Sequence, residues 1–264
     1  MNRLWLEPLA LSLRRSVGRA LGDFSMIQEG DKLLLGLSGG KDSLVLLHAL
    51  SEFRRHSPAR FELAACTVAL TGMDVSRLED YCRARQVPYI VLRHPIIEII
   101  ENRGERSPCS FCANLRRGML SSRAREDGFN KLALGHNLDD AVETFFMNLF
   151  HAGRAKSFQP KFFQDRTKVE VIRPLIYLRE TAIAAEAGRL GLPILVGACP
   201  YAGKTERQRT KEMLTELQAR VPDLFAHVLN ALKNLDSADR WIVEPTRKNK
   251  KESEENEKKT EAES

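Results

Sequence analysis

Six consecutive residues near the start of the chain, Ser38–Ser43, have the side chains and backbone freedom needed to hold a phosphate group. Their sequence is Ser-Gly-Gly-Lys-Asp-Ser, between two apolar runs. Gly39 and Gly40 allow the backbone to approach a ligand and to point N–H groups at an anion where a helix begins. Lys41 adds a cation, and Asp42 is suited to hold a Mg²⁺ ion that the phosphate shares. The segment predicts a phosphate-binding loop; a polar strand–helix turn is the alternative.

A second polar group occurs in the sequence KLALGHNLDDAVETFFMNLF, where Gly135, His136, Asp139, Asp140 and Glu143 surround the expected start of a helix. Carboxylates in a first helical turn are favoured by the helix dipole. Capping alone accounts for one aspartate. The alternative to simple capping is a metal-binding or proton-transfer role, which two aspartates flanked by a histidine and a glutamate indicate.

Two of the five cysteines, Cys109 and Cys112, form a C-x-x-C pair. Such a pair fits half of a zinc site, a redox pair or part of an iron–sulfur site. A complete zinc site needs four ligands, and the sequence has no second C-x-x-C or paired-histidine motif. Cys199 is expected in a loop at the same edge of the fold. Cys66 and Cys82 are expected within a strand and a helix, as buried small hydrophobic residues.

Strands and helices must alternate to position these residues. Apolar, partly β-branched runs predict strands over 32–37, 61–70, 89–93, 131–135 and 169–172. Helical patterns cover 42–53, 75–86, 112–126, 139–150, 180–190, 205–220 and 224–235. This alternation predicts an α/β fold with a doubly wound parallel sheet. Ligands bind such sheets beyond the carboxyl ends of the strands, where both polar groups are expected.

The composition is that of an ordinary globular chain, with 264 residues, 43% hydrophobic and 29% charged. No apolar run approaches the length of a membrane span, and the first residues lack a secretory pattern. We therefore expect a cytoplasmic protein with no membrane partner and no disulfide framework. The expected parts are an N-terminal helix over 1–25, one domain over 26–240 with the phosphate loop and the cysteine site, and a disordered charged tail over 241–264.

The net charge of +6 belongs to the folded part, because the last twenty residues carry six basic and six acidic side chains. A basic excess suits a polyanion such as RNA, although it equally fits a basic protein with no such partner. Arg116 and Arg117 follow the C-x-x-C pair, while Lys204, Arg207, Arg209 and Lys211 follow Cys199. They are candidates for phosphate contacts, or simply a solvated face.

The Ser38–Ser43 hexapeptide lacks the G-x-x-x-x-G-K-S/T spacing. It resembles the pyrophosphate-binding loop of the N-type ATP pyrophosphatases, the PP-loop family, which includes NAD synthetase, GMP synthetase, asparagine synthetase and several tRNA-modifying enzymes. The segment at His136 is similar to the G-H-x-x-D-D-x-x-E-T element of tRNA lysidine and tRNA 2-thiocytidine synthetases. The resemblance implies ATP binding, with Mg²⁺, by Ser38, Gly39, Gly40, Lys41, Asp42, Ser43, Val68, Gly135 and Asp140, and catalysis by Lys41, Asp42 and Asp140.

Nearly the whole chain resembles tRNA 2-thiocytidine synthetase, from SVGRALGDFSMIQEGDKLLLGLSGGKDS through CSFCANLRRGML and LALGHNLDDAVETFFMNLF to VIRPLIYLRE. The resemblance implies a Rossmann-like, adenine nucleotide alpha hydrolase-like fold and an ATP-dependent tRNA sulfurtransferase. Such an enzyme adenylates the C2 oxygen of an anticodon-loop cytidine and replaces it with sulfur. Three thiolates can hold a 4Fe-4S cluster and leave one iron open, and the implied ligands are Cys109, Cys112 and Cys199. Implied partners are tRNA, a cysteine desulfurase as sulfur donor, and a second copy in a homodimer.

Two residues depart from the family pattern. Asn137 follows His136 where family members commonly have a second histidine, and Ala202 stands where many have a cysteine three residues after Cys199. These departures suggest a divergent subgroup whose RNA substrate differs. Two other functions remain open: a lysidine-synthetase-like amide-forming enzyme, which needs no cysteines, and a non-catalytic ATP-binding relative. The complete phosphate loop argues against the latter.

Overall fold

The computed structural model describes residues 2–105, 107–195 and 206–234. Residues up to Leu229 form one compact unit; of a second unit, Asn230–Ser264, only residues 230–234 are described. Cys199 and the predicted tail lie outside the described residues. The elements are η1 (Arg3–Leu6), α1 (Leu11–Asp23), β1 (Lys32–Gly36), α2 (Lys41–His56), β2 (Glu62–Ala69), α3 (Ser76–Ala84), β3 (Tyr89–Arg93), α4 (Ile96–Arg103), α5 (Pro108–Glu126), β4 (Lys131–Ala133), α6 (Leu138–Ala152), β5 (Lys161–Gln164), β6 (Val169–Ile172), α7 (Glu180–Arg189), α8 (Glu206–Arg220) and α9 (Leu224–Lys233).

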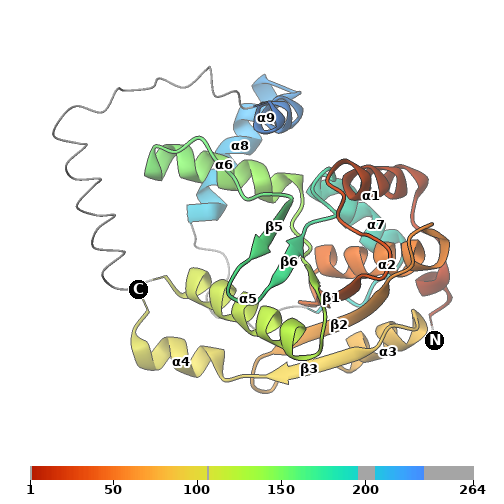
Figure 1. The fold of residues 1–264 in the computed structure, drawn as a ribbon. Coiled ribbons are helices and arrows are strands. Elements are labelled where there is room, and N and C mark those ends of the chain that lie inside the picture. The colour runs from red at the N-terminus through yellow and green to blue at the C-terminus, as the bar shows by residue number, and fades with distance from the viewer. Residues whose placement is uncertain (1, 106, 196–205, 235–264) are drawn as a thin grey trace, which may run out of the picture. The chain divides into compact units, whose positions relative to one another are not determined.

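The centre of the unit is a six-stranded sheet with the strand order β3-β2-β1-β4-β6-β5 (Figure 1). Neighbouring strands are parallel, except that β5 runs antiparallel to β6. The predicted α/β fold with a mostly parallel sheet is confirmed. The sequence did not predict the short edge strand β5 or the helix α4. The order reverses at β1, which has β2 on one side and β4 on the other, and this is where such sheets bind ligands.

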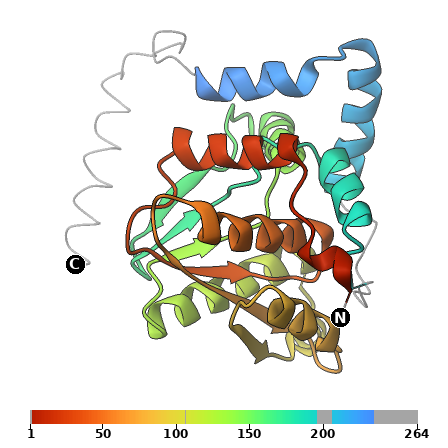
Figure 2. The same ribbon diagram turned by 90° about the vertical axis from the view of Figure 1, so that its right-hand side faces the viewer.

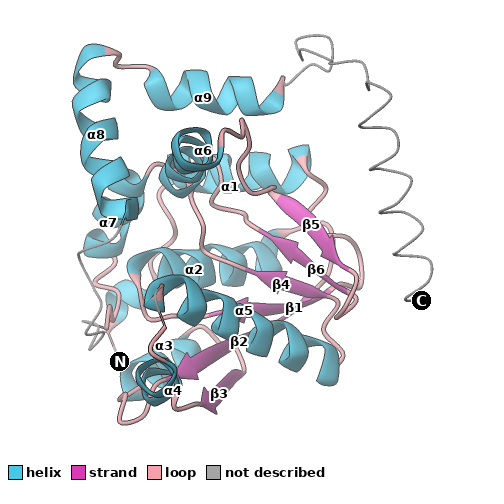
Figure 3. Cartoon of the chain, turned by 90° about the vertical axis from the view of Figure 1, so that its left-hand side faces the viewer, coloured by secondary structure: helices cyan, strands magenta, loops and turns pink. Residues whose placement is uncertain are grey.

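Helices cover both faces of the sheet, and the central strand is buried on both. Leu33, Leu35 and Leu37 belong to one apolar core with α1, α2, α3 and α7, while Leu34 belongs to a second core with α4 and α5. Strands covered on both faces have continuous apolar sequences, as β1 does. Figure 2 shows α2, in orange, in front of the strands, and Figure 3 shows α5 on the opposite face.

Residues 2–10 form an N-terminal strap across the α2 and α7 side of the unit. The indole Nε1 of Trp5 donates to the carbonyl of Gly191 at 2.9 Å, and the N–H of Ala10 donates to Glu186 at 2.8 Å. Arg85, fully buried, donates to the carbonyl of Trp5 at 3.1 Å. The strap and α1 therefore share the core of the unit.

Helix α5 begins earlier than the sequence predicted, at Pro108 instead of residue 112. Proline suits a first helical position, because its missing N–H would have no partner there. Both cysteines of the C-x-x-C pair consequently lie in the first turns of one helix. None of the helices in the described parts of the chain has the length and apolar character of a membrane span.

Candidate functional site

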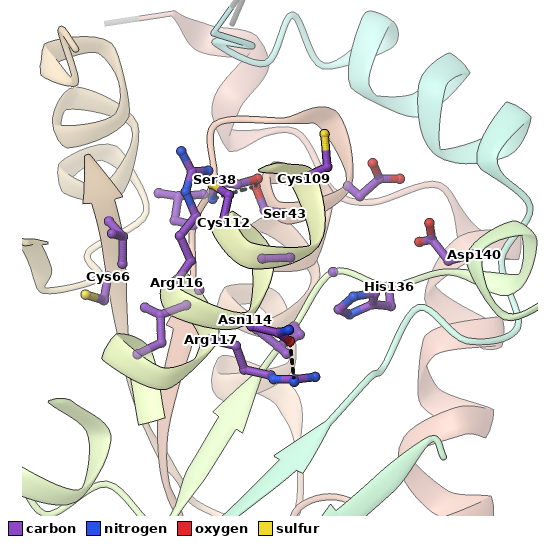
Figure 4. Close-up of a pocket in the computed structure, with 18 of the residues that line it drawn as sticks. Ser38, Ser43, Cys66, Cys109, Cys112, Asn114, Arg116, Arg117, His136 and Asp140 are labelled. Carbon is purple, nitrogen blue, oxygen red and sulfur yellow. Dashed lines mark hydrogen bonds between the residues drawn. The ribbon is translucent and has the colours of Figure 1, made fainter. Parts of the chain in front are cut away.

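A cavity of about 510 Å³ opens at the carboxyl ends of β1, β2 and β4 (Figure 4). Its walls come from the loop after β1, the end of β2, α4, α5, the loop after β4 and the start of α8. The predicted site residues that line it are Ser38, Asp42, Ser43, Val68, Cys109, Cys112, Gly135 and Asp140. Gly39, Gly40 and Lys41 complete the adjoining loop but do not line the cavity, and Cys199 lies outside the described residues.

The phosphate loop connects β1 to the start of α2. Gly39 has a φ of +83°, a left-handed conformation that favours glycine. No side chain of the described residues caps the start of α2, whose first N–H groups have no partner within the helix. The hydroxyls of Ser38 and Ser43 lie 3.1 Å apart, and Ser43 donates to the carbonyl of Gly40 at 2.9 Å. An uncapped helix start with two hydroxyls beside it can bind an anion.

Gly135 brings the end of β4 against the start of α2. A Cβ added at Gly135 would lie 3.0 Å from the backbone nitrogen of Ser43 and 3.1 Å from the carbonyl carbon of Asp42. Backbone atoms cannot move aside as a flexible side chain can. Glycine therefore permits the close approach that brings the phosphate loop and the start of α6 to one cavity.

Asn137 joins the two carboxylates that the sequence assigned to Mg²⁺. It is the N-cap of α6: its Oδ1 accepts from the N–H of Asp140 at 3.1 Å, and its own N–H donates to Asp140 Oδ2 at 3.0 Å. Its Nδ2 donates to Asp42 Oδ1 at 2.9 Å. This single side chain thus fixes both Asp42 and the first turn of α6. The sequence showed it only as a departure from the family pattern.

The two adjacent aspartates of α6 have different roles. Asp139 accepts hydrogen bonds from Arg179 Nε at 3.1 Å and from the N–H of Glu180 at 2.7 Å, so it attaches α6 to the start of α7. Asp140 faces the cavity instead. Asp139 is therefore a structural residue, and Asp140 is the candidate ligand for a cation.

Arg207 of α8 lies against the carboxylates of α6. Its Nη1 is 3.3 Å from Asp140 Oδ1, and its Nε is 3.7 Å from Glu143 Oε2. Burial raises the pKa of Asp140, although the N–H of Asn137 and the charge of Arg207 oppose the rise. Burial likewise raises the pKa of Glu143 to about 7. In this arrangement Arg207 neutralises acidic side chains, whereas the sequence had placed it among candidates for RNA phosphate contacts.

Lys41 is held beside the loop by two carboxylates. Its Nζ lies 2.8 Å from Glu180 Oε1 and 3.1 Å from Asp42 Oδ2. Burial opposes its charge, but the hydrogen bonds to Glu180 and Asp42 outweigh that effect, so the pKa of Lys41 lies above its usual value. Lys211 of α8 also pairs with Glu180. Lys41 is therefore a permanent cation next to the uncapped helix start.

The two cysteines of the C-x-x-C pair share one wall of the cavity. Cys109 and Cys112 are three residues apart on α5, so their side chains lie on one helical face, and Figure 4 shows both thiols at the cavity. Paired thiols on a cavity wall fit two of the three ligand positions expected for an iron–sulfur cluster. The third expected ligand, Cys199, falls in 196–205, outside the described residues. Within the described part of the chain, no three metal-ligating side chains are grouped together.

Cys66 also lines the cavity, which the sequence did not predict. It is buried within β2, in the core that includes α4 and α5, and burial raises its pKa to about 11. Cys82 is buried away from the cavity, and burial raises its pKa to about 12. Both residues are therefore protonated thiols, as expected of small buried residues.

Part of the remaining wall carries nitrogen donors, and the rest is apolar. Arg116 follows Cys112 by one helical turn, and its buried Nε has no hydrogen-bond partner among the described residues. Arg117 Nη2 donates to Asn114 Oδ1 at 2.9 Å. Burial, aided by neighbouring arginines, lowers the pKa of His136 to about 3, so its ring is neutral. These groups give the thiol side of the cavity a positive charge, suited to an anionic ligand.

Comparisons with known proteins agree with this arrangement. Residues 10–195 match the family model of the PP-loop domain. The chain is 40% identical over 235 residues to the tRNA-cytidine(32) 2-sulfurtransferase of Syntrophotalea carbinolica, which covers 87% of this chain and 91% of that relative. The enzyme of the same name from Pelobacter propionicus is 40% identical over 234 residues, 86% of this chain and 87% of the relative. Among solved structures, the U34-tRNA thiolase NcsA from Methanococcus maripaludis, with its 4Fe-4S cluster, superposes with a TM-score of 0.70 at 25% identity, covering 85% of this chain and 77% of that one.

Proposed function

The chain belongs to the PP-loop family and to its tRNA-cytidine(32) 2-sulfurtransferase branch, and from this premise we propose that it is an ATP-dependent tRNA sulfurtransferase. The family resemblance expected from the sequence is thereby confirmed. One observation carries the proposal: an uncapped helix start for phosphate and a pair of cysteines line the same cavity. An amide-forming enzyme needs no thiol at that place, so thiolation is favoured over the lysidine-synthetase-like alternative.

The residues assigned to ATP divide between the phosphates and the base. The backbone and hydroxyls of Ser38–Ser43 bind the β and γ phosphates, and Lys41 offsets their charge. Val68 and Gly135 line the cavity, which would hold the nucleoside. Asp42 and Asp140 would hold Mg²⁺, because paired carboxylates next to a phosphate are its usual ligands. Asn137 keeps both carboxylates in place.

The reaction has two displacements. The C2 oxygen of the cytidine attacks the α phosphorus; an O–P bond forms, the bond to the β phosphate breaks, and pyrophosphate leaves into the Ser38–Ser43 loop. A sulfide then replaces the adenylated oxygen at C2, and AMP leaves. A 4Fe-4S cluster bound by Cys109 and Cys112, with Cys199 as its third ligand, would supply an iron to hold that sulfide. Arg116 lies on the cavity wall where the negative charge of AMP must be neutralised.

The partners follow from the substrate. An anticodon-loop base is already unpaired, so turning it into the cavity costs little. Because the substrate is a tRNA, we place the enzyme in the cytoplasm. A cysteine desulfurase as sulfur donor and a homodimer remain predictions.

The test compares protein purified without oxygen as wild type, Cys109→Ala and Cys82→Ala. Iron, acid-labile sulfide and the visible absorption spectrum are measured first. We expect about four irons per wild-type chain, their loss in Cys109→Ala, and no loss in the control Cys82→Ala. Thiolation of unmodified tRNA, with AMP release, should follow the iron content. Thiolation that persists in iron-free protein would contradict the assignment of the cysteines.

A further inference from the structure

A segment beside the site has an unusual composition that the proposed chemistry does not explain. Residues 144–164 contain six of the twelve phenylalanines of the chain and no aspartate or glutamate. Two of these rings pack on the buried guanidinium of Arg173: Phe158 at 4.7 Å and Phe162 at 5.1 Å from ring centroid to Cζ. Of the other four rings, Phe163 lies on β5 next to Lys168, whose charge Asp165 opposes. The three on α6 lie close to cations that pair with no described carboxylate, a combination typical of surfaces that bind single-stranded nucleic acid.

The last turns of α6 present an exposed aromatic face. Phe146 and Phe150 are one turn apart, with ring centroids separated by 5.5 Å and planes tilted by 36°. Phe150 is 52% exposed and its neighbour Leu149 is 39% exposed. Helix α6 extends from the cavity toward the side of the unit that faces the viewer in Figure 3. At 1.5 Å per residue, Phe150 lies about 15 Å along the helix from Asp140.

Two cations stand next to this face. Gly153 ends α6 with a φ of +59°, and the chain then folds back along the last turn. The N–H of Arg154 donates to the carbonyl of Asn148 at 3.0 Å, and Asn148 Nδ2 donates to the carbonyl of Lys156 at 2.9 Å. Arg154 and Lys156 are exposed, and neither pairs with a carboxylate of the described residues.

One acidic side chain does reach this turn. Glu206 Oε2 lies 3.9 Å from Nε2 of His151, but the same residue also pairs with Arg209 at 2.6 Å. The local charge therefore stays positive. A second copy of the chain fits poorly, because it would bring two further cations against this face. A neutral protein partner also fits poorly, because Arg154 and Lys156 would lose their hydration without gaining an opposite charge. A polyanion with flat, apolar groups satisfies both the rings and the charges.

We propose that the α6 surface, made of Phe146, Leu149, Phe150, Arg154 and Lys156, binds RNA. An unpaired base stacks on Phe150, and Arg154 and Lys156 contact the phosphates beside it. The inference rests on the proposed function, in which tRNA supplies the RNA. At about 15 Å from Asp140, the stacked base is a different nucleotide from the one that reacts. The contact therefore fixes the position of the anticodon loop while the target base enters the cavity.

The test measures binding of unmodified tRNA to the full chain by fluorescence anisotropy over a range of salt concentrations. Phe150→Ala should weaken binding roughly tenfold, the size expected from the loss of one base–aromatic stack. Phe163→Ala is the matched control, because Phe163 is 54% exposed but lies on β5 outside the α6 surface. The double variant Arg154→Gln/Lys156→Gln should weaken binding and reduce the slope of log K against log salt by roughly 1.4. The charge control is Arg77→Gln on α3.

The experiment distinguishes four outcomes. Variants that lose tRNA affinity but keep the melting temperature and ATP affinity of the wild type support the inference. Variants that bind tRNA as tightly as the wild type overturn it and leave the proposed function intact, whereas a wild type that binds no tRNA overturns both. If Phe150→Ala changes the sedimentation coefficient of RNA-free protein, the surface belongs to a second copy, and the inference is wrong.

Discussion

Replacing Asn137 should separate two contributions of one side chain. In Asn137→Ala both the cap of α6 and the donor to Asp42 are lost. In Asn137→Ser the hydroxyl still accepts from the N–H of Asp140, because serine caps helices about as well as asparagine. The serine side chain is too short to reach Asp42, which Asn137 Nδ2 contacts at 2.9 Å. Both variants therefore lose the link to Asp42, and only alanine also loses the cap.

The magnitudes follow from the two hydrogen bonds. An N-cap contributes about 1 kcal/mol to the free energy of unfolding. A hydrogen bond to a charged group contributes about 1.5–3 kcal/mol when buried. The Asp42 side chain is 27% exposed, so water replaces part of the lost bond and about 1 kcal/mol is the better value. At about 2–4 °C per kcal/mol for a domain of this size, Asn137→Ser should lower the melting temperature by about 2–4 °C and Asn137→Ala by about 4–8 °C.

The functional effect should be the same in both variants. Without Asn137, Asp42 keeps its ion pair with Lys41 but loses its link to the start of α6, so Mg²⁺ must restore the geometry of Asp42 and Asp140 on binding. A cost of about 1 kcal/mol corresponds to roughly fivefold more Mg²⁺ for half-maximal ATP binding. Calorimetric titration of ATP at graded Mg²⁺ gives this value, and thermal melts give the stability. Equal melting temperatures for the two variants would refute the capping contribution, and an unchanged Mg²⁺ requirement would refute the positioning of Asp42.

Two further perturbations test the packing and charge of the site. Gly135→Ala should destabilise the fold by about 1–3 kcal/mol, because the new Cβ would press on the backbone of Ser43 and Asp42, and should weaken ATP binding as well. Gly118→Ala on α5, whose Cβ would meet nothing within 4 Å, should instead stabilise by about 0.5–1 kcal/mol; thermal melts of the two variants should shift in opposite directions. Because burial raises the pKa of Glu143 to about 7 from 4.5, its protonated form stabilises the fold fully below about pH 4.5, and this contribution is lost as the pH rises through 7. Urea unfolding of Mg²⁺-free protein at pH 5 and pH 8 should therefore show a smaller difference for Glu143→Gln than for the wild type; an equal difference would contradict the shifted pKa.

Local sequence patterns predicted the elements that build the site. The apolar runs of β1 and β4 and the polar segments that follow them are continuous in the sequence, so the phosphate loop and the start of α6 could be located from their own residues. Helix α4 was missed because its four isoleucines, in IIEIIENR, are residues typical of strands, and only packing in the core with α5 makes the segment a helix. Strand β5 was missed because it has only four residues and depends on its antiparallel pairing with β6 for its extended conformation.

Roles that depend on distant partners could not be found in the sequence. Asp139 and Asp140 are adjacent and chemically identical. They differ because Arg179 and Glu180, about forty residues later, contact only the first of them. Arg207 appeared to be a surface cation, but the packing of α8 on α6 places it on Asp140. The sequence showed Asn137 as a departure from the family pattern. Its role could not be predicted, because its partner Asp42 is 95 residues away in the sequence.

The N-terminal strap has a consequence for the order in which a newly made chain can fold. Trp5 bonds to Gly191 across 186 residues, and Ala10 bonds to Glu186 across 176, so the strap cannot be fixed until those much later residues have been synthesised. The phosphate loop also depends on a residue synthesised much later, because the N–H of Leu195 donates to the carbonyl of Gly39 at 2.9 Å. Contacts this far apart form slowly, since the whole intervening chain must be closed into a loop. A nascent chain that ends before Leu195 therefore has the loop sequence but lacks the residue that bonds to Gly39, so the nucleotide site is completed only after residue 195 has been added.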